Sequence, residues 1–310
     1  MDVEKIRYAR KMKNDEFYTQ RCTIEEELVY WPNLFQNKTV YCNCDMDESE
    51  FVRFFKDNFN RLGLTRLIYS SYNPNGKGKY SIVESTHTQT HMLEGNGDFR
   101  SDECIKLLDM SDIVVTNPPF SLLREFIWLM YDHKKDYLVI GSLMTAVTQN
   151  LKPLIGTYIR LGYTHHSGHI VFKVPFDFLL YEHSKDTDSV HVKNGETYVD
   201  VTSTRWITNL PTNLPKKNLT KVYNPTDYPK YIDYDYINVN RICDIPIDYY
   251  EPMGVPITFM DWYNESEWEI LDLIKPKILK NGVPIRTFQR LIVKRKKRTE
   301  ARNGKEQTDA

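Results

Sequence analysis

Residues 112–120 read Asp-Ile-Val-Val-Thr-Asn-Pro-Pro-Phe, and they indicate the fold more strongly than any other segment. A short β-branched run, typical of a buried strand, ends at an Asn-Pro-Pro-Phe turn. The next residues, Leu122–His133, place apolar side chains at helical spacing, with Ser121 as the expected N-cap. A strand, a tight turn and a helix in succession predict an α/β sheet, in which ligands bind outside the carboxyl ends of the strands. The turn therefore lies where a functional site is expected.

The turn presents hydrogen-bond acceptors on a rigid backbone. Two successive prolines, Pro118 and Pro119, restrict two φ angles and remove two N–H donors. The side-chain oxygen of Asn117 and the carbonyl of Pro118 remain as acceptors, and the ring of Phe120 follows them. Two acceptors can hold an amino group that is conjugated with a ring, and they stabilise the positive charge that its nitrogen gains as it attacks a methyl group. The alternative is a structural Pro-Pro turn in which Asn117 is a local cap.

The first two-thirds of the chain alternate between apolar or aromatic runs and amphipathic stretches. This alternation predicts a mostly parallel sheet covered by helices. The expected strands are Thr39–Asn43, Arg66–Ser71, Ile113–Thr116 and Tyr137–Gly141, with further strands at Ile170–Val174 and Arg205–Thr208. The expected helices are Glu48–Arg61, Ser101–Leu108 and Leu122–His133.

The composition changes near Asn209, where Pro and Asn become frequent and indicate a linker or a long loop. We therefore expect one domain over residues 1–212 and a smaller region over residues 213–310. The smaller region is rich in tyrosine, for which packing is favoured over stacking on bases. It also contains an expected strand at Gly254–Phe259 and a hairpin turn at Asn281-Gly282.

The charge of the chain is unevenly distributed. The formal net charge is −1, but residues 275–298 hold ten basic residues and no acidic one, so the rest of the chain carries −11. Such asymmetry is typical of a protein with one face that binds a polyanion through its phosphates. A solvated basic tail is the alternative for residues 294–298. The candidate phosphate contacts are Arg286, Arg290, Lys294, Arg295, Lys296 and Lys297.

Several functional classes find no support in the sequence. No apolar run reaches the roughly 18 residues of a membrane helix, and the charged first residues are unlike a signal peptide. Five cysteines, an odd number, disfavour a disulfide framework and fit a reducing cytoplasm. Cys42 and Cys44 are too close together for a zinc site, and no carboxylate or cysteine pattern supports a metal at His165, His166 and His169. We expect no metal, no membrane partner and a cytoplasmic location.

Several motifs together resemble those of the EcoRI-type adenine-specific DNA methyltransferases. The similar segments are Asp15–Gln20 (DEFYTQ), Val40–Asp45 (VYCNCD), Gly95–Ser101 (GNGDFRS), Asn117–Phe120 (NPPF), Trp206–Leu210 (WITNL) and Gly254–Phe259 (GVPITF). Cofactor elements precede the catalytic turn, as in the class whose recognition region is carboxy-terminal. The resemblance extends over the whole chain.

The resemblance implies a fold and an activity. The fold would be a Rossmann-like sheet that binds S-adenosylmethionine, with helices on both faces and a smaller carboxy-terminal recognition region. The activity would be methyl transfer from S-adenosylmethionine to the N6 amino group of an adenine flipped out of double-stranded DNA, with S-adenosylhomocysteine as product. The expected context is a bacterial or phage-infected cell, with or without a cognate restriction endonuclease that shares the site.

The resemblance also assigns roles to particular residues. The catalytic turn would be Asn117, Pro118, Pro119 and Phe120. The cofactor pocket would contain Phe17, Tyr18, Thr19, Cys42, Asn43, Asp45, Asp98 and Phe99. Among these, Asn43 and Asp45 are candidates for the amino and carboxylate groups of the cofactor, and Asp98 is the candidate for its adenine amino group. A helix cap is the alternative role for Asp98.

Two departures from the methyltransferase pattern keep alternatives open. The loop after the first strand, residues 42–45, contains no glycine, although glycine usually lets this backbone approach the cofactor. The second strand ends in Ser70-Ser71-Tyr72, without the acid that usually binds the ribose. The alternatives are a methyltransferase for RNA adenine or protein glutamine, and a DNA-binding relative that has lost turnover.

Overall fold

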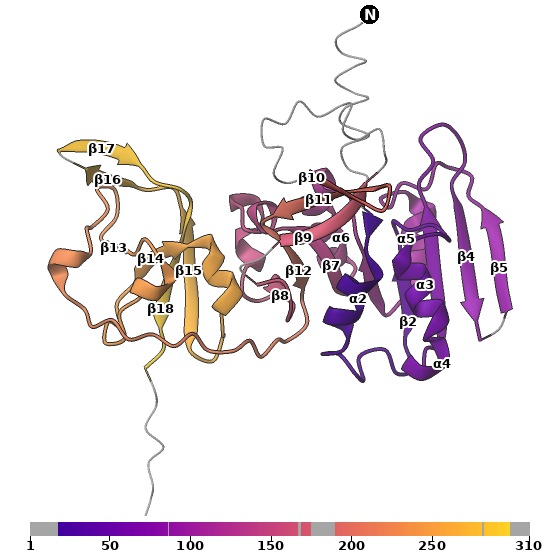
Figure 1. The fold of residues 1–310 in the computed structure, drawn as a ribbon, viewed down its shortest axis with the longest axis horizontal. Coiled ribbons are helices and arrows are strands. Elements are labelled where there is room, and N and C mark those ends of the chain that lie inside the picture. Colours follow the sequence, from indigo (N-terminus) through magenta and orange to yellow (C-terminus); the bar gives the residue numbers. More distant parts are fainter. Residues whose placement is uncertain (1–17, 86, 167–168, 175–189, 281, 298–310) are drawn as a thin grey trace, which may run out of the picture. The chain divides into compact units, whose positions relative to one another are not determined.

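The computed structural model describes residues 18–85, 87–166, 169–174, 190–280 and 282–297. The chain divides into two compact units, residues 1–213 and 214–310. Figure 1 shows both as a ribbon. Each unit contains its own β-sheets.

The amino-terminal unit contains a large mixed sheet of eight strands in the order β5-β4-β3-β2-β6-β7-β12-β8. The four central strands are parallel, and they are β3 (Arg66–Ser71), β2 (Thr39–Cys42), β6 (Ile113–Thr116) and β7 (Asp136–Ser142). The outer strands pair antiparallel, and they are β4 (Lys79–Glu84), β5 (His87–Met92), β12 (Thr204–Thr208) and β8 (Arg160–Leu161). The carboxyl ends of the central strands meet at one edge of the sheet.

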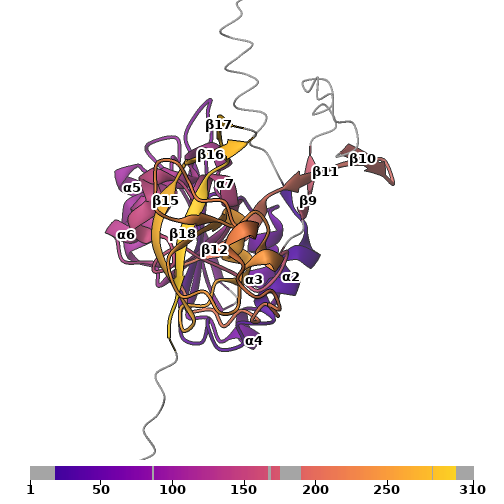
Figure 2. The same cartoon turned by 90° about the vertical axis from the view of Figure 1, so that its left-hand side faces the viewer.

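Helices cover both faces of this sheet because the side chains of its strands alternate between the faces. Val40 and Cys42 of β2 belong to the core that packs under α2 (Arg21–Leu28), α3 (Glu50–Asp57) and α4 (Phe59–Leu62). Tyr41 lies on the opposite face, where its hydroxyl reaches Cys104 of α5 (Asp102–Asp109). Helix α6 (Leu123–Asp132) packs there too, and Figure 2 shows the two groups of helices on opposite sides of the strands. A short helix α7 (Leu143–Ala146) and two 3-10 segments, η1 (Phe120–Leu122) and η2 (Gln149–Leu154), complete the layer.

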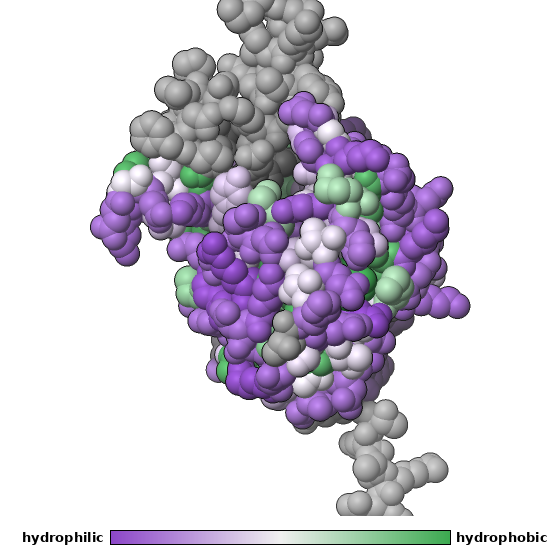
Figure 3. Space-filling view, turned by 90° about the vertical axis from the view of Figure 1, so that its right-hand side faces the viewer, coloured by the Kyte–Doolittle hydropathy of each residue, from purple (hydrophilic) through white to green (hydrophobic). Residues whose placement is uncertain are grey.

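The expected strands are confirmed, but the expectation of a mostly parallel sheet is wrong outside the four central strands. The hairpin β4–β5 adds an antiparallel edge whose six outermost residues are all exposed. These residues are His, Thr, Gln and Met, and Figure 3 shows that this side of the unit is largely hydrophilic. A polar, exposed edge strand gives little hydrophobic pattern, which is why the sequence did not indicate it.

Two helix predictions need correction. The expected helix Glu48–Arg61 is two helices, because the side chain of Asn58 donates to the Phe54 carbonyl at 2.8 Å and ends α3. Ser121 is not the N-cap of the helix after the turn. The η1 segment intervenes, and α6 begins after Leu122 without a side-chain cap.

A second sheet in the amino-terminal unit joins the beginning of the chain to its middle. Its strands are, in order, β1 (Tyr18–Thr19), β9 (His169–Val174), β11 (Glu196–Thr202) and β10 (Val190–Lys193), all antiparallel. The inward side chains Ile170, Phe172 and Val174 of β9 enter the same core as α2 and α3. This sheet therefore packs on the α2–α3 face of the unit.

The carboxy-terminal unit contains a four-stranded sheet and a separate two-stranded ribbon. The sheet has the order β13 (Ile237–Asn238), β14 (Met253–Pro256), β18 (Arg290–Arg295) and β15 (Trp268–Ile274), with 3-10 segments η4 (Pro225–Asp227), η5 (Ile242–Asp244) and η6 (Ile257–Trp262) around it. The ribbon pairs β16 (Lys277–Lys280) with β17 (Val283–Arg286). The predicted hairpin turn is confirmed by this register and by the φ of +77° at Gly282, whereas Asn281 lies outside the described residues. The expected strand Gly254–Phe259 ends earlier, at Pro256.

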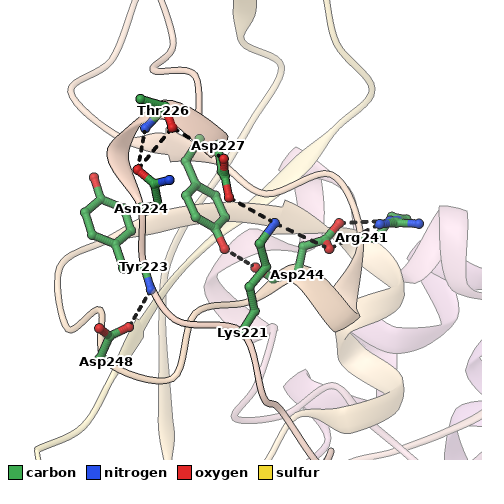
Figure 4. A network of polar contacts seen from close by, with 9 residues as sticks. Lys221, Tyr223, Asn224, Thr226, Asp227, Arg241, Asp244 and Asp248 are labelled. Carbon is green, nitrogen blue, oxygen red and sulfur yellow. Dashed lines mark hydrogen bonds and ion pairs between the residues drawn. The ribbon is translucent and has the colours of Figure 1, made fainter.

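The tyrosines of this unit pack mainly against one another and against charged groups, as predicted. The ring of Tyr223 lies 5.5 Å from that of Tyr228 and 4.6 Å from that of Tyr249. The Tyr228 hydroxyl donates to the Asp244 carbonyl at 2.7 Å. Figure 4 shows Lys221 between the carboxylates of Asp227 and Asp244 in the same network. These contacts give residues 221–250 a defined structure without an α-helix or a long strand.

Candidate active site

The Asn-Pro-Pro-Phe turn follows β6 directly at the carboxyl edge of the large sheet. Thr116, the last residue of the strand, is fully buried, and so is the side-chain oxygen of Asn117. Pro118 is buried, while Asn117 and Phe120 are half-buried. The Leu122 amide donates to the Pro119 carbonyl at 2.9 Å and starts the 3-10 turn. The turn is thus fixed at its base by the buried strand and at its end by η1.

Asp45 connects the expected cofactor loop to this turn. The Thr116 hydroxyl donates to the Asp45 carboxylate at 2.6 Å, and the Asp45 amide donates to the Ser70 carbonyl at 3.1 Å. Asp45 therefore joins the ends of three strands, because it follows β2, its side chain contacts β6 and its backbone amide contacts β3. Burial raises the pKa of Asp45 to about 6, against the opposing effect of hydrogen bonds from Thr116 and Ser49. Within the described ranges, no basic side chain pairs with this carboxylate.

The rest of the loop after β2 is held by local hydrogen bonds. Asn43 is 2% exposed, and its carbonyl accepts from the Ser70 hydroxyl at 3.4 Å. The Cys44 thiol donates to the Asn43 side-chain oxygen at 3.6 Å. Cys42 points into the core under α3, and burial raises the pKa of its thiol, so only its backbone is available to a ligand. No residue of the loop has a positive φ, so its backbone does not require glycine.

Strand β1 brings the amino-terminal motif beside the Asn-Pro-Pro-Phe turn. Thr19 pairs with Phe172 of β9, and the Phe172 ring lies 5.9 Å from the Phe120 ring in an edge contact. The Thr19 hydroxyl is buried and has no hydrogen-bond partner among the residues that the structure describes. Tyr18 is 45% exposed, and Phe17 lies outside the described residues.

Asp98 and Phe99 already have partners inside the protein. The Asp98 carboxylate accepts from the Arg100 guanidinium at 2.7 Å, which lowers the pKa of that carboxyl. Asp98 is not a helix cap, because Ser101 caps α5 by accepting from the Cys104 amide at 3.3 Å. The Phe99 ring is 4% exposed and lies 5.5 Å from the Phe126 ring of α6.

The glycine segment before Asp98 is held in place by hydrogen bonds to neighbouring segments. The Asn96 carbonyl accepts from the Asn73 amide at 2.8 Å, and the Glu103 carboxylate accepts from the Gly95 amide at 2.8 Å. Gly97 has a φ of +82°, and a Cβ on it would collide with the Ser71 carbonyl oxygen. Glycine is needed here because the segment passes directly over the end of β3.

The six candidate phosphate contacts differ in exposure. Arg286, Lys296 and Lys297 are exposed, and Lys294 is half-buried. Arg290 is only 8% exposed, and its guanidinium donates to the Asn238 side-chain oxygen at 3.3 Å inside the unit.

Arg295 also serves the packing of the carboxy-terminal unit. Its guanidinium lies 4.6 Å from the Trp268 ring and donates to the Ile247 carbonyl at 2.6 Å. Arg290 and Arg295 thus stabilise this unit in the structure and do not present their charges openly. The basic run contains residues of both kinds because Arg290, Lys294 and Arg295 belong to the packed strand β18, whereas Arg286 lies in the exposed strand β17 and Lys296 and Lys297 follow the end of β18.

Sequence reasoning missed two residues of the site, Thr116 and Phe172. Neither belongs to a polar motif. The contact of Thr116 with Asp45 joins residues 71 positions apart, and that of Phe172 with Phe120 joins residues 52 positions apart. Their only signal was position, since Thr116 directly precedes the turn. In the described part of the chain, no three side chains of His, Cys, Asp and Glu gather as they would around a metal ion. No helix there is long and apolar enough to cross a bilayer.

Comparison with known proteins identifies the family. The family described as "Adenine-specific methyltransferase EcoRI" matches residues 5–92 and 77–309. The Type II methyltransferase M.EcoRI of Escherichia coli is 40% identical over 291 residues, covering 86% of this chain and 88% of that protein. M.MgeORF184P of Mycoplasma genitalium is 40% identical over 276 residues, covering 86% and 85%. M.MpnI of Mycoplasma pneumoniae is 38% identical over 272 residues, covering 86% and 84%. The chain belongs to the EcoRI family of adenine-specific DNA methyltransferases.

Proposed function

We propose that this enzyme transfers a methyl group from S-adenosylmethionine to the N6 amino group of an adenine within a specific double-stranded DNA sequence. The hydrogen bond from Thr116 to Asp45 carries this proposal, because it joins the expected cofactor loop to the expected base-binding turn. In this assignment the eight-stranded sheet is the Rossmann-like methyltransferase sheet. Both reactants would then lie at its carboxyl edge, as in other open α/β enzymes.

The residues at this edge fit the charge of the cofactor. S-adenosylmethionine supplies an electrophilic methyl group on a positively charged sulfur and carries an ammonium group. Asp45 offers a buried carboxylate that has only neutral donors as neighbours among the described residues. An ammonium group beside it would satisfy a charge that is otherwise costly to bury. We assign Asp45 and Asn43 to the amino and carboxylate end of the cofactor, and the buried hydroxyl of Thr19 to the same pocket.

The assignments of Asp98 and Phe99 follow from their surroundings. Asp98 has a carboxylate that Arg100 keeps ionised, so it can accept a hydrogen bond from the adenine amino group of the cofactor while still paired. Phe99 is packed against Phe126, and we assign its ring to supporting the pocket from inside. Tyr18 is exposed and lies next to Thr19, and we assign its ring to covering the ligand.

The catalytic turn would orient the target amino group. The side-chain oxygen of Asn117 and the Pro118 carbonyl accept its two N–H groups and direct the lone pair at the methyl group. As the nitrogen becomes positive, the same two oxygens stabilise it. Phe120 stacks on the base, and the edge contact from Phe172 keeps its ring in place. The prolines keep the acceptors rigid, so little reorganisation accompanies the reaction.

Access to this turn requires that the adenine leave the duplex. Extruding a base costs a few kcal/mol, which contacts elsewhere on the DNA must offset. We assign those contacts to the carboxy-terminal unit, where Arg286, Lys296 and Lys297 are exposed. Where a cognate restriction endonuclease is present, methylation of the shared sequence would protect the DNA from it.

The test incubates the purified enzyme with S-adenosylmethionine and unmethylated genomic DNA, and sequencing then maps the modified bases. We expect N6-methyladenine in one short sequence. Asn117→Ala should abolish this product, while calorimetry should still detect S-adenosylmethionine binding. Transfer to RNA or to protein glutamine, without transfer to DNA, would refute the assigned substrate. Cofactor binding without transfer to any substrate would identify a relative that has lost turnover.

A further inference from the structure

The β16–β17 ribbon, Lys277–Lys280 paired with Val283–Arg286, pairs with no other strand in the part of the chain that the structure describes. Figure 1 shows it extending beyond the ends of β15 and β18 in the carboxy-terminal unit. Neither the catalytic turn nor the cofactor loop explains a projecting arm of this kind.

Large apolar side chains on and beside the ribbon are exposed. Leu279 is 58% exposed, Val283 59% and Ile285 37%, and Phe288, just after the ribbon, is 85% exposed. Isolated exposed apolar residues are ordinary, but several on one small element mark a binding surface. A partner that removes these side chains from water would therefore gain free energy.

The register of the ribbon places cations beside these apolar groups on both faces. Directly paired residues share a face, and the faces alternate along each strand. One face carries Lys277 with Arg286 and Leu279 with Pro284, and the other carries Ile278 with Ile285 and Lys280 with Val283. Each face thus combines positive charge with an apolar surface.

The base of the ribbon is anchored, so the arm is held in a defined position. Ile278 packs on the small core of Tyr231, Ile274 and Ile292. The Ile232 amide donates to the Lys277 carbonyl at 2.9 Å, and the Thr287 amide donates to the Pro276 carbonyl at 2.9 Å. A preorganised arm loses less conformational entropy on binding than a disordered one.

The charge of the region selects the occupant. Residues 275–286 contain four basic residues, Lys275, Lys277, Lys280 and Arg286, and no acidic one, so a second copy of the same surface would be repelled. A polyanion with flat apolar groups between its charges matches the ribbon on both properties. Duplex DNA has this character, since phosphates line its grooves and base edges form their floors. The major groove, about 12 Å wide, admits a two-stranded ribbon.

We propose that the β16–β17 ribbon enters a groove of duplex DNA, with Lys277, Lys280 and Arg286 on phosphates and Leu279 and Val283 against base edges. This proposal rests on the proposed function, because it takes DNA as the substrate. It goes further by separating two roles within one element. The cations supply affinity without sequence information, and the apolar tip contributes to the choice of site.

The first arm of the experiment tests the cations. A triple variant, Lys277→Gln, Lys280→Gln and Arg286→Gln, is titrated with a random-sequence duplex at several salt concentrations. Each lost phosphate contact lowers the slope of log affinity against log salt by about 0.9, so the slope should fall by roughly 2 to 3. The fold is not at risk, because the substituted side chains are exposed or half-buried.

A matched variant controls for the loss of three charges. Lys38→Gln, Arg61→Gln and Lys134→Gln remove three cations near the amino ends of β2, β3 and β7, the edge opposite the catalytic turn. Its salt slope should stay within about 0.5 of the wild-type value, less than one phosphate contact. Equal slopes for the two triple variants would overturn the proposed role of the ribbon cations.

The second arm tests the apolar tip. Leu279→Ser with Val283→Ser should leave the salt slope unchanged but lower kcat/KM for methylation of unmethylated plasmid DNA by about tenfold or more, the effect of losing a base contact. Leu271→Ser, which alters a 40% exposed residue of β15, is the control and should change kcat/KM less than twofold. An unchanged kcat/KM in the double variant would refute the groove contact.

Two measurements separate this proposal from the proposed function. If wild-type enzyme binds S-adenosylmethionine but methylates no DNA, the proposed function fails. If it methylates DNA while every ribbon variant behaves like its control, only the ribbon assignment fails. If the wild-type enzyme bound vesicles of anionic phosphatidylglycerol through the ribbon in preference to DNA, the assignment of the ribbon to a DNA groove would also be overturned.

Discussion

Replacing Asp45 by Asn should stabilise the cofactor-free enzyme at neutral pH and weaken its binding of S-adenosylmethionine. Burial raises the pKa of Asp45 from its ordinary value of 3.8 to about 6. One pKa unit corresponds to about 1.4 kcal/mol, so the ionised carboxylate costs the folded state about 3 kcal/mol. Asparagine has the same shape and can still accept from the Thr116 hydroxyl, but it carries no charge.

The direction of the pH dependence follows from the raised pKa. Below about pH 4 the carboxyl is protonated in both the folded and the unfolded state, so it does not change the free energy of unfolding. As the pH rises from 4 through 6, the unfolded chain ionises first and the folded state loses stability. The free energy of unfolding of the wild type, relative to Asp45→Asn, should therefore fall by about 3 kcal/mol over this window and stay constant above it.

Urea unfolding of both proteins between pH 4 and pH 8 measures this difference, and subtraction removes the titration of all other groups. Calorimetry then measures cofactor affinity. Wild-type binding should strengthen up to tenfold per pH unit below 6, because the ammonium group requires the ionised carboxylate. At pH 8 the variant should bind roughly 10- to 100-fold more weakly, as expected for one charge-assisted hydrogen bond. A constant difference in unfolding free energy from pH 4 to pH 8 would refute the burial argument.

Three further predictions concern single contacts. Glu27→Gln should lower the free energy of unfolding by about 3 kcal/mol in urea titrations, because this fully buried carboxylate accepts from four donors. A loss below about 1 kcal/mol would contradict that role. Gly97→Ala should lower the melting temperature more than Gly195→Ala. Gly195 has a similar positive φ but open space around it, so its replacement should lower the free energy of unfolding by about 1 kcal/mol. Equal losses in melting temperature would show that the contact with the Ser71 carbonyl is unimportant. Thr116→Val should raise the pKa of Asp45 and shift the acid limb of the rate profile to higher pH, and a profile that does not move would exclude this coupling.

Local pattern was sufficient for the parallel centre of the fold. The strands after residues 38, 65, 112 and 135 are short, apolar and buried on both faces, so their composition identifies them. The antiparallel edge β4–β5 escaped prediction because its outer strand is polar and exposed along its whole length. Ser121 was a plausible cap by composition, but the rigid prolines direct the chain into a 3-10 turn before α6 begins.

The sequence by itself determined the Asn-Pro-Pro-Phe turn and the family motifs, because residues adjacent in the chain carry them. Only the tertiary structure decided which of the candidates lie together. Thr116 contacts Asp45 through the parallel pairing of β2 and β6, and Thr19 reaches the Asn-Pro-Pro-Phe turn through Phe172. It also separated the exposed Arg286 from the buried Arg290, which look alike in a basic run. A contact between distant segments depends on strand order and register, and neither is encoded in any single stretch of residues.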